Sequence, residues 1–238
     1  MSGIIAVNSN CYHGFTLEQA ISGIRRAGFR YIELTATKGW TEHVFPDMPF
    51  ERLLAVQDEL DEAGLIPFSM SGHCNLMDTA RIGDFVKNIR LAAFFGCRYI
   101  VSSIGEAHLK DRAVADAATV ADHIAALLPE LEKYNLMLVL ETHGHDHGTG
   151  AVLAACVNDV GYLHLKDKAG APDEWNFPAL GKGTIDFPGI FSILRQAGNE
   201  SPLSIEIEFT QAGPGDVTEV DRAVADSAAY LTAHGFTL

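Results

Sequence analysis

The sequence predicts an α/β fold in which a parallel sheet closes into a (β/α)8 TIM barrel, and three observations predict it. Strand-like and helix-like patterns alternate almost from end to end. The predicted strands are short and apolar, as expected of parallel strands covered on both faces. The length of 238 residues is close to the ~250 residues typical of this barrel. We therefore expect residues 1–238 to form a single domain.

The first half of the chain alternates three predicted strands with three predicted helices. Each helix carries a start or stop signal: Thr16 can cap the first, Pro49 opens the second, and Gly96 ends the third. Apolar residues recur at helical spacing within the helices. The predicted strands are 4–7, 31–34 and 65–70, and the predicted helices are 17–27, 49–63 and 78–95.

The second half continues the alternation but is one unit short. The predicted strands are 97–102, 136–141, 160–165 and 203–208, and the predicted helices are 111–134, 151–158, 187–196 and 220–233. Seven strands result, whereas the closed barrel needs eight. Because the segment after residue 141 leads into only one short helix, we expect one βα unit to be missing between residues 149 and 152. An open, doubly wound sheet is the alternative, but no GxGxxG motif follows the first strand.

Composition restricts the partners of the protein. The chain has 17 Lys and Arg against 31 Asp and Glu residues, which gives a net charge of −14 at pH 7 and argues against nucleic acid. No apolar run approaches the ~18 residues of a membrane span, and residues 1–5 do not read as a signal peptide. The cysteines show no CxxC spacing, which indicates reduced thiols. We therefore predict a cytoplasmic protein without membrane partners. The composition is also compatible with a homo-oligomer.

Three predicted strands deliver a side chain that can bind a metal ion near the point where the strand ends. These side chains are Glu141, His164 and Glu206. Parallel sheets place their chemistry at the carboxyl ends of the strands, so we predict that the three residues form a divalent-metal site. Glu208 lies on the same side of its strand as Glu206 and is the alternative ligand. Taken singly, each residue is more often explained by an ion pair, a helix cap or a hydrogen-bonded core histidine.

Two glutamates around one cation indicate proton transfer beside a carbonyl group. A bound Mn²⁺, Zn²⁺, Co²⁺ or Mg²⁺ ion polarises the oxygens of a ketose and acidifies the neighbouring C–H group. Either Glu141 or Glu206 then removes this proton, and the other returns it to the opposite face or to the neighbouring carbon. The cation also offsets the repulsion between the two carboxylates. We therefore expect both glutamates to be catalytic.

Other side chains at or after strand ends are candidates for substrate binding: His73, Lys166, His108, Trp40, Trp175 and Glu33. The lysine lies two residues beyond His164 and should share its face of the strand. The tryptophans lie in long loops, which often cover the substrate in barrels. Structural alternatives remain for each: a loop histidine, an ion pair, local loop packing or a buried carboxylate with a partner.

An ordered series of short motifs resembles the sugar phosphate isomerase/epimerase family, which has a xylose-isomerase-like TIM barrel. The motifs are Tyr31-Ile32-Glu33-Leu34, Ser71-Gly72-His73-Cys74-Asn75-Leu76, Leu140-Glu141-Thr142-His143-Gly144, His164-Leu165-Lys166-Asp167, Gly181-Lys182-Gly183-Thr184-Ile185-Asp186-Phe187 and Ser204-Ile205-Glu206-Ile207-Glu208. The resemblance implies one divalent cation held by Glu, Asp, His and Glu from four successive strands. Glu141, His164 and Glu206 match three of these ligands. The strand that carries the Asp is missing, and His145, Asp146 or His147 could substitute for it.

The resemblance implies a metal-dependent isomerase or epimerase of a small ketose or polyol-derived keto compound, acting through an enediolate. Two alternatives stay open. One is a dehydratase-type lyase of the same barrel family, with a dehydroshikimate-like substrate. The other is a catalytically inactive barrel that serves as a binding module, which the missing Asp suggests. The DNA-repair endonuclease branch of the fold is disfavoured by the net charge of −14.

Overall fold

The computed structural model describes residues 3–105, 115–141 and 150–238. Its residues fall into two compact units, of which unit 1 comprises residues 1–32, 63–65 and 143–238 and unit 2 comprises residues 33–62 and 66–142. Strands and helices alternate in both units, as predicted. The single domain over residues 1–238 stays a prediction. Every helix within the described ranges is too short or too polar to cross a bilayer.

Unit 1 contains three strands that pair in parallel, with β9 between β1 and β7. Leu203 of β9 lies opposite both Ile5 and Leu163, so hydrophobic side chains occupy one level of this sheet. The strands are β1 (Ile5–Asn8), β7 (Leu163–Leu165) and β9 (Leu203–Ile205). The remaining elements are η1 (Ser9–Tyr12), α1 (Leu17–Arg26), α5 (Gly150–Cys156), β8 (Asn176–Phe177), α6 (Phe187–Ala197), β10 (Phe209–Thr210) and α7 (Val217–Ala233).

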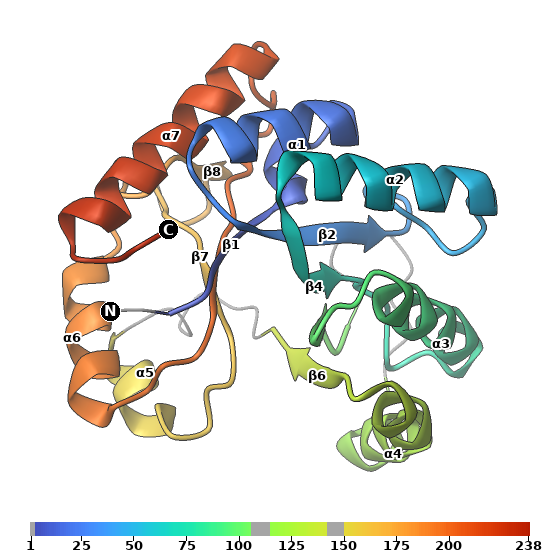
Figure 1. Cartoon of the computed structure of the whole chain (residues 1–238). Coiled ribbons are helices and arrows are strands. Elements are labelled where there is room, and N and C mark those ends of the chain that lie inside the picture. The colour runs from blue at the N-terminus through green and yellow to red at the C-terminus, as the bar shows by residue number, and fades with distance from the viewer. Residues whose placement is uncertain (1–2, 106–114, 142–149) are drawn as a thin grey trace. The chain divides into compact units, whose positions relative to one another are not determined.

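Helices α1 and α7 pack side by side (Figure 1), and a polar cluster joins them to η1. Tyr12 Oη donates to Asp221 Oδ1 at 2.8 Å, and Arg26 forms an ion pair with the same carboxylate. Gly23 permits this approach, because a Cβ at that position would lie 1.8 Å from Tyr12 Oη. Thr16 caps α1, as predicted. The first and last helices of the chain are thereby fixed to each other.

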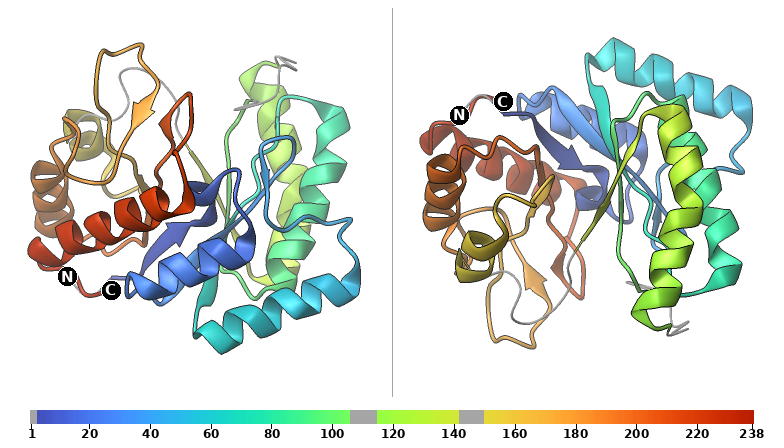
Figure 2. Two further views of the ribbon diagram at one scale, coloured as in Figure 1. Left: turned by 90° about the horizontal axis from the view of Figure 1, so that it is seen from above. Right: turned by 90° about the horizontal axis from the view of Figure 1, so that it is seen from below.

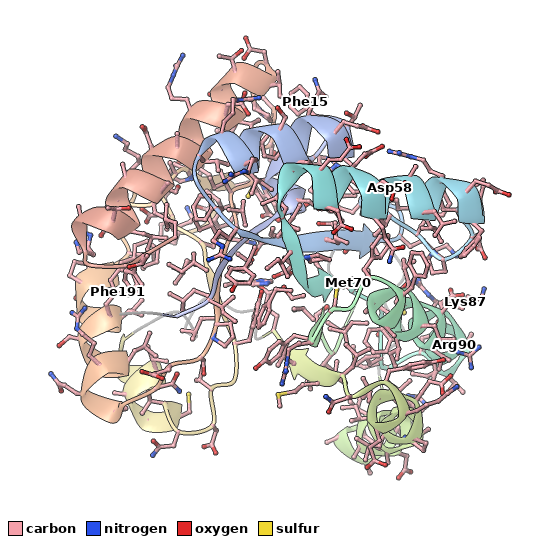
Figure 3. All side chains as sticks on the ribbon, viewed as in Figure 1. Phe15, Asp58, Met70, Lys87, Arg90 and Phe191 are labelled. Carbon is pink, nitrogen blue, oxygen red and sulfur yellow. The ribbon has the colours of Figure 1, made fainter. Side chains whose placement is uncertain are left out.

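Helix α6 supplies the aromatic centre of unit 1. Phe191, labelled in Figure 3, is fully buried, and its ring lies 4.7 Å from that of Phe236 and 6.0 Å from that of Phe187. Aromatic pairs at such separations stabilise a core beyond the area that they bury. The helix begins at the capping residue Asp186, whose Oδ1 accepts from Gly189 N at 3.0 Å.

In unit 2, strands β4, β5 and β6 pair in parallel, and β2 lies beside β4. Helices α3 and α4 run side by side (Figure 2). Arg90 of α3, labelled in Figure 3, donates to Glu130 of α4 at 2.6 Å. The elements are β2 (Tyr31–Thr37), β3 (Thr41–Glu42), α2 (Phe50–Ala63), β4 (Ile66–Ser71), α3 (Thr79–Phe94), β5 (Tyr99–Ser102), α4 (Ala117–Tyr134) and β6 (Met137–Leu140).

The predicted alternation is confirmed over the described residues. The seven predicted strands correspond to β1, β2, β4, β5, β6, β7 and β9. Between β6 and β7, the described part of the chain supplies helix α5 and no further strand. Residues 142–149, which adjoin the expected gap, lie outside the described residues.

The prediction differs from the structure mainly in short elements and helix starts. It missed β3, β8, β10 and the 3₁₀-turn η1, because a two-residue ladder or a single turn has no periodic pattern. It began the α4 helix at residue 111 and the α7 helix at residue 220. The structure begins them after the capping residues Asp116 and Asp216, which each accept a hydrogen bond from a backbone N–H three residues later.

Replacement of Phe191 tests the aromatic centre of unit 1. Phe191→Ala leaves a cavity among rings that cannot fully close on it, so we expect the free energy of unfolding to fall by about 3–5 kcal/mol. Leu128→Ala is the control, since this α4 residue is 47% exposed and should change the free energy by about 0.5 kcal/mol or less. Urea unfolding followed by circular dichroism measures both. Equal effects of the two substitutions would contradict the assignment.

Candidate functional site

His164 and Glu206 lie side by side at the carboxyl ends of β7 and β9 in unit 1. His164 is the central residue of β7 and lies opposite Ser204 of β9, and Glu206 directly follows the last residue of β9. Glu206 N continues the ladder by donating to Leu165 O at 3.0 Å. His164 Nδ1 lies 3.3 Å from Glu206 Oε2, and both side chains are 6% exposed. The parallel register therefore brings two predicted metal ligands into contact.

Lys166 forms ion pairs with two glutamates at this edge of unit 1. Its Nζ lies 3.0 Å from Glu206 Oε2 and 3.2 Å from Glu208 Oε2. The ammonium group also lies 5.2 Å from the centre of the Phe177 ring. Glu208 Oε1 accepts from Asn10 Nδ2 at 3.4 Å. One lysine therefore pairs with two acids whose side chains are only 6% and 4% exposed, and without it both charges would be costly to bury.

The neighbours of Glu206 keep it ionised. Burial raises the pKa of this carboxyl, but Lys166 and His164 lower it, and together they hold its pKa well below its usual range. An ionised carboxylate can bind a metal ion and can also accept a proton. Glu206 Oε2 is also the atom that lies 3.3 Å from His164 Nδ1.

The residue types of unit 1 fit a divalent cation. A carboxylate oxygen and an imidazole nitrogen, 3.3 Å apart, converge at the strand ends, and this pair of ligand types suits Mn²⁺, Co²⁺ or Zn²⁺. Lys166 supplies the positive charge near Glu206. His164 and Glu206 are thus able to hold such an ion together, and a cation there would share with Lys166 the task of balancing the carboxylates.

The loop after Lys166 is organised by a buried carboxylate that the sequence interpretation did not single out. Asp167, which is fully buried, accepts hydrogen bonds from the backbone N–H groups of Lys168, Gly181, Gly183 and Ile185 at 2.8–3.2 Å. Gly183 must lack a side chain, because a Cβ there would lie 2.3 Å from Asp167 Oδ1. The signal in the sequence was the pair of Lys-Asp and Gly-x-Gly motifs, which meet in space.

This loop carries Trp175, one of the predicted substrate-binding residues. Its ring packs edge-on against that of Phe177 at 5.1 Å. Phe177 also lies beneath Lys166. The aromatic pair therefore lies next to the lysine of the candidate site, within unit 1.

In unit 2, His73 and Glu141 lie together at the ends of neighbouring strands. Glu141 directly follows β6, and its backbone N–H donates to Ser102 O of β5 at 2.9 Å. His73 Nε2 lies 3.5 Å from Glu141 Oε2, with side chains 6% and 17% exposed. The third predicted metal ligand thus has a predicted substrate-binding histidine as its neighbour.

The other predicted substrate-binding residues have different surroundings. Glu33 is fully buried in β2, four residues before the strand ends, and accepts a hydrogen bond from Ser69 Oγ at 3.2 Å. Trp40 follows the same strand and is partly buried, and its backbone N–H donates to Thr37 O. His108 lies outside the described residues, as do His145, Asp146 and His147.

A pocket in unit 2 opens beside His73. Charged side chains of both signs line it, as do Phe45 and Asn88. At its wall, Asp84 is shared by Lys38, Arg81 and Lys87 at 3.4–3.7 Å. Such a mixture of hydrogen-bond donors and acceptors suits a hydroxylated molecule better than an apolar one.

A family model described as xylose isomerase-like TIM barrel matches residues 21–160. The chain belongs to this family. The predicted fold class and family resemblance are thereby confirmed. None of the curated proteins compared with the chain matches it.

Solved structures with a similar fold cover nearly the whole chain. A D-allulose 3-epimerase from Methylomonas sp. is 16% identical, with a TM-score of 0.74 over 98% of this chain and 99% of that chain. An L-ribulose 3-epimerase is 18% identical, with a TM-score of 0.70 over 99% and 94%. A xylose isomerase domain protein from Planctomyces limnophilus is 18% identical, with a TM-score of 0.74 over 98% and 97%. At these identities the likeness concerns the fold.

Substitution of Gly183 tests the cradle around Asp167. In Gly183→Ala the new methyl group collides with Asp167 Oδ1 and with the carbonyl oxygen of Lys168, both 2.3 Å away. We expect the free energy of unfolding to fall by about 1–3 kcal/mol. Gly83→Ala is the matched control, because no atom lies within 4 Å of a Cβ there and alanine favours its helix. Urea unfolding of the two variants checks the prediction, and an unchanged Gly183→Ala protein would contradict it.

Removal of the Lys166 charge should destabilise the protein most at neutral pH. Since the pKa of Glu206 is lowered by folding, its contribution to stability is present above about pH 4.5 and is lost as the pH falls through the folded-state pKa. We expect Lys166→Met to cost about 3 kcal/mol at pH 7. The deficit should shrink below pH 4.5, because protonated glutamates do not need the lysine.

Urea unfolding at pH 7 and in acid, with a chelator present, measures this pH dependence. Lys133→Met is the control, since this lysine is 58% exposed and exposed ion pairs contribute little. A Lys166→Met deficit of the same size at both pH values would show that the lysine acts by packing and not by charge.

Proposed function

We propose that the protein is a divalent-metal-dependent isomerase or epimerase of a small ketose or a polyol-derived keto compound. The observation that carries the proposal is the contact between His164 and the ionised Glu206 at the strand ends of unit 1. Membership of the xylose isomerase-like family and a fold shared with 3-epimerases of allulose and ribulose support it. In this proposal the chain acts as a single barrel domain in the cytoplasm.

The proposed metal ligands are Glu141, His164 and Glu206. His164 and Glu206 are in contact within unit 1, and the family resemblance implies Glu141 as the third ligand. The bound ion would supply Lewis-acid polarisation of the substrate carbonyl and hydroxyl groups. Mn²⁺, Zn²⁺, Co²⁺ and Mg²⁺ are the ions to test, because carboxylate and imidazole ligands suit them.

The two glutamates would move the proton. One carboxylate removes the proton from the carbon beside the carbonyl, which gives an enediolate, and the other acid returns a proton. Return to the opposite face of the same carbon is epimerisation, and return to the neighbouring carbon is isomerisation. Lys166, which touches Glu206, keeps that carboxylate in its ionised form.

A second candidate function is sugar binding without catalysis. The described residues contain no strand between β6 and β7, and this favours it, because the resemblance places the Asp ligand on a strand at that point of the chain. The mixed-charge pocket beside His73 could hold a sugar in either case. Metal content separates the two functions, since a binding module needs no ion.

Deuterium incorporation tests the proposed reaction. Protein supplied with each metal in turn is incubated in D₂O with a panel of ketopentoses and ketohexoses, including allulose and ribulose. We expect deuterium beside the carbonyl of the product, detected by NMR and mass spectrometry. Glu141→Gln and Glu206→Gln should each lower the rate by about 10²–10⁴-fold, because each removes a proton-transfer group.

Glu132→Gln is the control, since this glutamate is exposed on α4. Elemental analysis should find about one ion per chain in the wild type and far less in His164→Ala. If no ketose incorporates deuterium with any metal while the protein holds about one ion per chain, the proposed reaction is contradicted and the metal site is not. Low metal content with measurable sugar binding would favour the binding module.

A further inference from the structure

The segment that carries His73 is tied along the end of β5. Gly72 N donates to Val101 O at 3.0 Å, and Leu76 N donates to Ile104 O at 2.9 Å. Between them, Cys74 N donates to Ser102 Oγ at 3.2 Å. Backbone bonds on both sides of His73 therefore fix the position of its Cα, in continuation of β4, the strand that carries the labelled Met70 in Figure 3.

The surroundings of the imidazole decide which of its nitrogens carries the proton. Ser103 N donates to His73 Nδ1 at 3.1 Å. The Ser103 hydroxyl lies 3.4 Å from the same nitrogen, and it donates its own hydrogen to Gly105 O at 2.7 Å. A hydrogen on Nδ1 would collide with the backbone hydrogen of Ser103. The ring is therefore in the tautomer with Nδ1 as acceptor and Nε2–H as donor.

The Nε2–H group faces Glu141. Nε2 lies 3.5 Å from Glu141 Oε2, and the histidine side chain is only 6% exposed, so little water competes for the contact. Catalytic hydrogen bonds are often long without substrate and tighten when it binds. The backbone N–H of Glu141 donates to Ser102 O, and the imidazole contacts its carboxylate. Glu141 is thereby held at its backbone and at the end of its side chain.

We propose that His73 is a positioning residue that holds the Glu141 carboxylate in one orientation by donating from Nε2, and that it is not itself a ligand of the substrate. This proposal rests on the proposed function, because that function is what gives Glu141 a proton to transfer. The tautomer and the contact are independent of that role, so a spectroscopic measurement separates the two.

The first experiment reads the tautomer directly. The full-length protein, labelled with ¹⁵N-histidine, is studied by long-range ¹H–¹⁵N correlation spectra at neutral pH, and His73→Gln assigns the signals. We expect one slowly exchanging set of His73 signals with the proton on Nε2. Glu141→Gln should shift the Nε2 signal, whereas the exposed Glu132→Gln should not. A proton on Nδ1, protons on both nitrogens, or equal effects of the two glutamine variants would overturn the proposal.

The second experiment compares side chains that replace different nitrogens of the ring. Gln can place an amide donor near the position of Nε2, whereas Asn reaches only as far as Nδ1. We expect His73→Gln to keep kcat within about threefold. His73→Asn and His73→Ala should lower kcat by about 10–100-fold, the usual effect of losing a support for a metal-binding group, with KM changed less than threefold. Ser103→Ala retains the backbone donor and should behave as the wild type.

The outcomes of the kinetic series are distinct. A large rise in KM with kcat preserved would make His73 a substrate ligand and overturn the proposal. Equal losses in the Gln, Asn and Ala variants would mean that shape and not donation matters, which also overturns it. If no ketose reacts, the proposed function fails, and the spectroscopic experiment still decides whether His73 holds Glu141.

Discussion

The chemistry available in unit 1 depends on the compensation of buried negative charge by Lys166. Two glutamates lie within 3.2 Å of its ammonium group, and each has a side chain at most 6% exposed. Burial alone would favour their neutral forms. Because the lysine and His164 outweigh burial, the pKa of Glu206 lies well below its usual range. The ionised carboxylate is what makes this strand end a plausible place for a cation and for proton transfer.

Asp167 and Glu206 follow adjacent strands and are stabilised in different ways. The difference indicates a structural role for Asp167 and a chemical role for Glu206. Asp167 accepts four backbone N–H bonds, which satisfy both of its oxygens within the loop. A carboxylate bonded in this manner holds the loop and has little capacity for another partner. Glu206 faces an ammonium group and an imidazole, which belong to side chains and not to the backbone. The acid that is open to a ligand is therefore Glu206, although Asp167 is the more deeply buried of the two.

The sequence predicted the fold and much of unit 1, because both follow from periodicity. Seven strands and the residues at their ends could be read from apolar runs that stop at Glu141, His164 and Glu206. The contact of Lys166 with Glu206 agrees with the shared face expected from the two-residue spacing after His164. The cradle of Asp167 could not be predicted, since three of its four donors lie 14 to 18 residues away in a loop without periodic pattern. The tautomer of His73 likewise depends on a backbone N–H of another strand end.

The two proposed catalytic glutamates have neighbours of different charge, which bears on how they could share a reaction. Glu206 faces the ammonium group of Lys166, which favours the ionised form at all times. Glu141 faces the imidazole of His73, whose Nδ1 accepts a backbone hydrogen bond. The imidazole is therefore neutral and turns the N–H dipole of Nε2 toward the carboxylate. A neutral donor orients a carboxylate while opposing its protonation far less than a full charge does. Within the proposed mechanism, the two carboxylates would therefore meet the substrate in different electrostatic surroundings, Glu206 beside a full positive charge and Glu141 beside a neutral N–H donor.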